Sequence, residues 1–97
     1  MWELLDKSQQ TLFITNRCGI EGDSITYEMI HECEYTLNRT QRDTYIDYVS
    51  ARVADTAYRE VDPDHESAAN VYYFHLLRVP LETRAKMLWH VLNGVQP

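Results

Sequence analysis

The chain has 97 residues, the size of one small domain, and we treat residues 1–97 as a single domain. It is 44% hydrophobic and 25% charged, with only three glycines and three prolines, which excludes a fibrous or largely disordered chain. A net charge of −6 argues against direct binding to nucleic acid or to an anionic membrane surface.

We expect the compartment from two kinds of segment that the sequence does not show, a membrane-spanning helix and a secretory signal. No stretch approaches the roughly 18 apolar residues of a membrane-spanning helix, and no charged and then apolar start resembles a secretory signal. We therefore expect a cytoplasmic protein whose two cysteines, Cys18 and Cys33, are reduced. Cys33 fits best as a small hydrophobic residue of the core.

The first segment is compatible with a helix and with a strand. Trp2, Leu5, Leu12 and Phe13 can share one face of a helix, whereas residues 11–15 could equally form a short strand. We favour the helix and keep the strand as the alternative.

Residues 25–37 alternate between apolar and acidic side chains, as a half-buried strand would. At about 100° per residue, however, every aliphatic residue falls within one arc of roughly 140° on a helix. These residues are Ile25, Met29, Ile30, Cys33 and Leu37. A strand would instead place Ile30 on the acidic face, so we predict a helix that is capped by Asp23 or Ser24.

The second half of the chain predicts further helices. Residues 41–60 form an amphipathic pattern with Thr40 as the cap, and residues 65–78 are apolar around the whole circumference. Pro80 suits the first turn of the next helix, and Gly94 marks its end. The predicted fold is therefore all-α, a small compact bundle of four to five helices.

Acidic residues gather in two places. One lies between residues 18 and 38, where there is no lysine or arginine, and the other is residues 62–66, at the start of the predicted helix 65–78. The candidate acidic partner-binding residues are Glu21, Asp23, Glu28, Glu32, Glu34, Asp62, Asp64 and Glu66. Two explanations remain open. The acids either form a solvated face that keeps the protein soluble, or they imitate nucleic-acid phosphates or meet a basic partner.

Seven tyrosines are more than a small core can bury. They either cover the core with their hydroxyls in water or supply an interface, where tyrosine is enriched. Tyr48 and Tyr58 lie off the apolar arc of their helix, and Phe74 lies away from the Tyr72–Leu76 side, so these three are the candidate aromatic contacts.

Motifs for catalysis and metal binding are absent from the sequence. There is no nucleophile elbow, phosphate-binding loop or zinc-protease helix. The acidic run 62–67 lacks the glycine of a calcium loop, with Ser67 in its place. On a helix His31 and Cys33 would point about 160° apart, so they could not share a zinc ion. We expect no enzyme, no catalytic residue, no metal and no cofactor.

These observations favour a small non-enzymatic interaction protein that binds and regulates a larger protein through an aromatic and acidic surface. Inhibition is the favoured direction of regulation, and an accessory protein of a phage or mobile element would suit this size. The alternative is an acidic nucleic-acid mimic that occupies the groove of a nuclease, a restriction or defence complex, or a polymerase. A small enzyme or metal-binding protein is the second alternative, and a homo-oligomer remains open.

Overall fold

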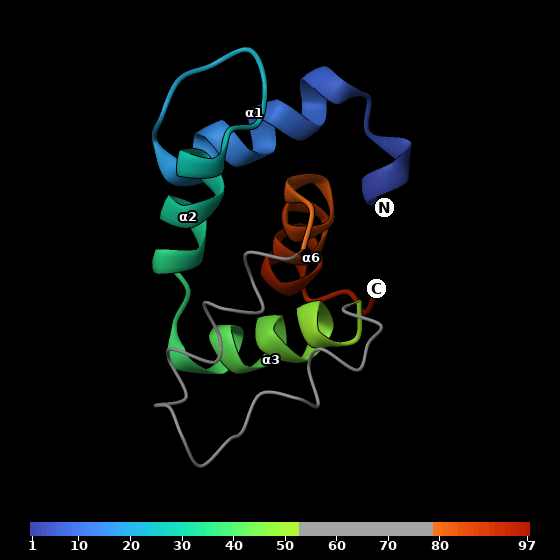
Figure 1. The fold of residues 1–97 in the computed structure, drawn as a ribbon. Coiled ribbons are helices and arrows are strands. Elements are labelled where there is room, and N and C mark those ends of the chain that lie inside the picture. The colour runs from blue at the N-terminus through green and yellow to red at the C-terminus, as the bar shows by residue number, and fades with distance from the viewer. Residues whose placement is uncertain (53–78) are drawn as a thin grey trace.

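The computed structural model describes residues 1–52 and 79–97, and within this part of the chain every regular element is a helix (Figure 1). The elements are the short 3-10 helix η1 (Trp2–Leu4) and the α-helices α1 (Lys7–Cys18), α2 (Tyr27–Tyr35), α3 (Arg39–Ser50) and α6 (Leu81–Asn93). The predicted all-α bundle is confirmed. The predicted helix over residues 65–78 lies outside the described residues.

Helix α6 lies at the centre of the described elements. Figure 1 shows α1 across the top, α2 down one side and α3 along the bottom, with α6 between them. Helix α6 packs against α2, α3 and η1, and α1 packs against α2. This arrangement turns one face of α2 toward α6 and leaves the opposite face of α2 on the outside.

The N-terminal segment is helical, as we favoured, but it is not one continuous helix. Leu5 is extended, with φ −83° and ψ 136°, and Asp6 then starts α1 with a capping box in which Gln9 is the partner. Because of this break the predicted common face does not form. Trp2 is buried, whereas Leu12 is 57% exposed.

Two helix starts differ from those predicted. Thr26, not Asp23 or Ser24, caps α2, and its hydroxyl accepts the backbone N–H of Met29 at 3.3 Å. Asn38, not Thr40, caps α3 and forms a reciprocal capping box with Gln41 at 2.8 and 3.0 Å. The predicted C-cap is confirmed, since Gly94 adopts the left-handed conformation with φ 67°.

The core is formed by apolar side chains from all five described helices. Helices α2 and α6 contribute three buried hydrophobic residues each. The buried hydrophobic residues of the core are Trp2, Ile14, Met29, Ile30, Cys33, Leu37, Tyr45, Val49, Val79, Ala85, Met87 and Leu88. The predicted aliphatic face of residues 25–37 is buried except for Ile25, which is half-buried. Helix α3 ends at Ser50, earlier than the predicted range 41–60, and the residues of that range from 53 onward lie outside the described part.

Replacing the cap of α3 gives a direct test of this helix start. Asn38→Ala removes the acceptor for the Gln41 N–H and should cost about 1 kcal/mol of unfolding free energy. For a domain of this size the melting temperature should fall by about 4–8 °C, measured by circular dichroism. Thr40→Ala, in the first turn of the same helix, is the matched control and should change the melting temperature little. A larger loss from Thr40→Ala than from Asn38→Ala would contradict the assigned cap.

Candidate functional site

Glu34 lies in the last turn of α2 and is buried, with 6% of its surface exposed. Its carboxylate faces α6, where Arg84 Nη2 donates to Oε1 at 2.6 Å and Arg84 Nε donates to Oε2 at 3.1 Å. The hydroxyl of Tyr45, on α3, also donates to Oε2. Our prediction that Glu34 is part of an acidic binding surface is therefore wrong, because its charge is satisfied inside the protein.

Arg84 is the largest fully buried side chain among the described residues, with 1% of its surface exposed. Burial by itself would lower the pKa of Arg84, but the hydrogen bonds and the charge of Glu34 outweigh that effect and raise the pKa above its usual value. The guanidinium also lies beside the ring of Tyr27, 4.9 Å from the centroid. Within the described part of the chain its Nη1 has no hydrogen-bond acceptor, and the cation–π contact with Tyr27 adds to the hydrogen bonds that Nε and Nη2 make.

The buried Arg84–Glu34 pair was missed by our sequence reasoning, although the pattern held a signal for it. Arg84 stands between Leu81 and Leu88 at helical spacing on the apolar face of α6. Glu34 is four residues after Ile30 on the apolar face of α2. Two opposite charges on the buried faces of two helices point to an internal ion pair, since a buried charge needs a partner.

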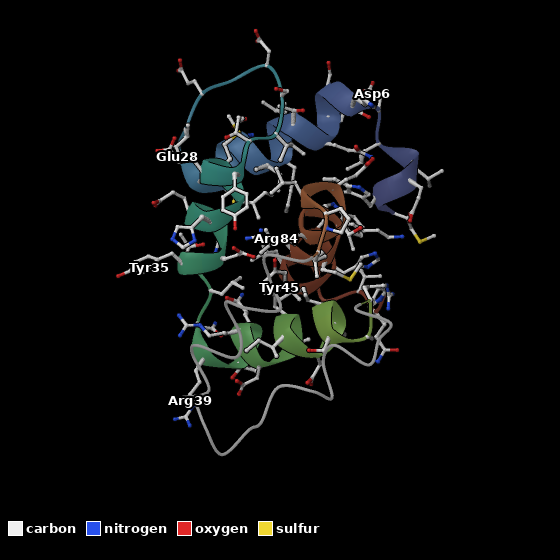
Figure 2. All side chains as sticks on the ribbon, viewed as in Figure 1. Asp6, Glu28, Tyr35, Arg39, Tyr45 and Arg84 are labelled. Carbon is white, nitrogen blue, oxygen red and sulfur yellow. The ribbon has the colours of Figure 1, made fainter. Side chains whose placement is uncertain are left out.

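A row of exposed aromatic rings runs along α2, from the edge of its buried face at Tyr27 to its outer side at Tyr35. Tyr27, His31 and Tyr35 are four residues apart and therefore lie along one side of the helix. Tyr35 is 75% exposed and Tyr27 is 45% exposed. Glu28 and Glu32 follow Tyr27 and His31 directly and are also exposed. We call these five residues the α2 outer face, and Figure 2 shows Glu28 and Tyr35 pointing away from the bundle while Arg84 and Tyr45 point inward.

The connection between α1 and α2 extends the negative charge of the α2 outer face. Glu21 and Asp23 are exposed there, and no lysine or arginine occurs between residues 18 and 38. Four of the eight predicted acids, Glu21, Asp23, Glu28 and Glu32, are therefore exposed in one segment. Asp62, Asp64 and Glu66 lie outside the described residues.

The aromatic residues that we predicted as contacts are not those of the α2 outer face. Tyr48 is half-buried and packs against the core, so most of its ring serves the fold and not a free surface. Tyr58 and Phe74 lie outside the described residues. Tyr27 and Tyr35 were not among the predicted contacts, because the alternating pattern of residues 25–37 groups them with its apolar residues.

Neither a metal site nor a membrane helix is found where the structure can be described. Across residues 1–52 and 79–97 no group of three or more histidine, cysteine or acidic side chains is placed to hold a metal ion. In the same residues no helix has the length and apolar character to cross a membrane. Comparisons with known protein families, with curated proteins and with solved structures found no match. The case for a function therefore depends on the surface itself.

Breaking the Arg84–Glu34 pair should be far more costly than replacing both partners. Glu34→Gln leaves the Arg84 charge buried without a counter-charge and should cost about 3–5 kcal/mol of unfolding free energy in urea denaturation. Glu34→Leu combined with Arg84→Met removes both charges. The double replacement should cost less than the sum of Glu34→Leu alone and Arg84→Met alone. Additive costs would show that the two side chains do not depend on each other.

Proposed function

We propose that this is a non-enzymatic binding protein of the cytoplasm that attaches to a larger protein through the α2 outer face and inhibits it. The observation that carries the proposal is the row of exposed rings beside exposed carboxylates on one helix. Tyrosine rings contribute large contact area at low entropic cost, which is why they are enriched in interfaces. Carboxylates in the same place select a basic partner and steer its approach.

The support beneath the α2 outer face favours binding as well. Tyr27 is exposed on one side and lies against Arg84 on the other, and Arg84 is itself held by Glu34. A surface ring that is already held in place loses less conformational entropy when a partner covers it. The proposed contact is thus a preorganised surface, with Tyr27 near one end of the helix and Tyr35 at the other.

A second candidate function, the acidic mimic of nucleic acid, is favoured by the four exposed acids of residues 21–32. Since no basic side chain interrupts this segment, its charge can approach a groove that is built for phosphates. The two candidates share the surface and differ in which residues carry the affinity. In the first it is the rings, and in the second it is the carboxylates.

The aromatic candidate is tested with Tyr35→Ala. The tagged full chain is used to capture its partner from a native lysate, the partner is identified by mass spectrometry, and binding is then titrated. Loss of a well-exposed interface tyrosine should weaken binding about tenfold or more without changing the melting temperature. Leu12→Ala is the matched control, because Leu12 is also an exposed apolar side chain but lies on α1. Equal effects of the two replacements, or none from Tyr35→Ala, would exclude Tyr35 as an anchor.

The acidic candidate is tested with the double replacement Glu28→Gln and Glu32→Gln. Binding should weaken at about 0.1 M salt and hardly differ from wild type at about 1 M, where opposed surface charges are screened. Stability should stay equal or rise by a few tenths of a kcal/mol, because like charges four residues apart repel on a helix. The matched control is Asp43→Asn with Asp47→Asn, which makes the same change at the same spacing on α3.

Competition separates the mimic from an ordinary basic partner. If the acids occupy a nucleic-acid groove, added double-stranded DNA should release the captured partner at low salt. If the partner remains bound in excess DNA and is lost only with Tyr35→Ala, the mimic is wrong and the aromatic contact stands.

A further inference from the structure

The two cysteines of the chain meet at the junction of α1 and α2. Cys18 is the last residue of α1, and Cys33 lies in the buried face of α2. The Cys33 thiol donates to the backbone oxygen of Ile14 at 3.6 Å. In an α-helix that same oxygen accepts the backbone N–H four residues later, which belongs to Cys18. The Cys33 sulfur therefore lies against the turn of α1 that carries Cys18.

The Cys18 sulfur lies at the C-terminal end of α1, in contact with backbone atoms of Thr15 and Ile20. It is half-buried, accepts the backbone N–H of Ile20 at 3.4 Å and lies 3.8 Å from the oxygen of Thr15. Burial, together with smaller effects of the charge and hydrogen bonding of Cys18, raises the pKa of the Cys33 thiol to about 12. The two thiols therefore lie at the same junction of α1 and α2, although 14 residues separate them in the sequence.

We propose that Cys18 and Cys33 form a reversible disulfide within the chain, with a small-molecule disulfide such as oxidised glutathione as the oxidant. The more accessible Cys18 reacts first. Its thiolate attacks one sulfur of the oxidant, a mixed disulfide forms, and one glutathione thiolate leaves. Cys33 then loses its proton to solvent, its thiolate attacks Cys18 Sγ, and the second glutathione leaves. Two protein thiols are oxidised and one glutathione disulfide is reduced to two thiols.

The proposed bond would close a loop of the chain that contains the acidic segment. Residues 19–32 lie between the two cysteines and include Glu21, Asp23, Glu28 and Glu32. A disulfide would tie the end of α1 to the last turn of α2 and restrict this loop in the unfolded chain, which stabilises the folded state. This inference concerns the thiols alone and stands or falls independently of the proposed binding function.

The test is incubation of the purified full chain with oxidised glutathione, followed by intact mass analysis under non-reducing conditions. We expect a monomer that has lost two hydrogens and carries no glutathione, with a melting temperature several degrees higher than that of the reduced chain. A disulfide-linked dimer, or wild type that retains glutathione as a stable mixed disulfide, would overturn the proposal.

Single replacements assign the two steps. Cys33→Ser should stop at the mixed disulfide on Cys18, whereas Cys18→Ser should take up glutathione much more slowly, because Cys33 is buried. Cys33→Ala serves in place of Cys33→Ser if the serine variant does not fold. Closure in wild type should speed up about tenfold per pH unit below the pKa of Cys33, as the thiolate fraction rises. Equal labelling of both single variants would contradict the order of attack.

Discussion

The described part of this fold is organised around one buried ion pair, Arg84 and Glu34. Removing a guanidinium and a carboxylate from water costs several kcal/mol for each ion, and attraction between them compensates only when the geometry is good and the remaining lone pairs are bound. Arg84 and Glu34 meet this condition through two parallel hydrogen bonds, and Tyr45 occupies a further site on the carboxylate. Since these three residues come from α6, α2 and α3, one polar contact fixes the mutual position of three helices. Apolar side chains alone would tolerate small rotations of each helix, whereas this network does not.

The same network connects the interior to the surface. Tyr27 touches Arg84 with one side of its ring and faces solvent with the rest of it. A partner that covers Tyr27 would shield the cation–π contact from water and strengthen it, because electrostatic contacts are stronger when they are desolvated. Tyr27 therefore belongs both to the α2 outer face and to the packing around the buried Arg84–Glu34 pair.

In α2 the helical period predicted the buried aliphatic residues, because burial of an apolar face is a strong local signal in a sequence. Met29, Ile30 and Cys33 of α2 are buried, as is Leu37 just after the helix. The cap residues were harder to predict. Thr26 and Asn38 compete with nearby residues that also cap helices well, and the path of the backbone selects between them. Glu34 was misassigned because charge predicts exposure on average. Its burial depends on Arg84, which is 50 residues away in the sequence, so the position of Glu34 beside the apolar face of α2 becomes informative only together with that of Arg84 on α6.

Helix α2 is the element that most needs its neighbours. It has nine residues, fewer than an isolated helix requires in water, and Glu28 and Glu32 repel each other along it. A short helix with unfavourable charge spacing persists only when tertiary contacts hold it. Here Arg84 holds the last turn of α2 through Glu34, and the Ile14 carbonyl of α1 accepts the thiol of Cys33 in the same turn. The stability that α1 and α6 supply to α2 allows it to carry Glu28 and Glu32 four residues apart together with the exposed ring of Tyr35, and this is the physical reason to look for a partner there.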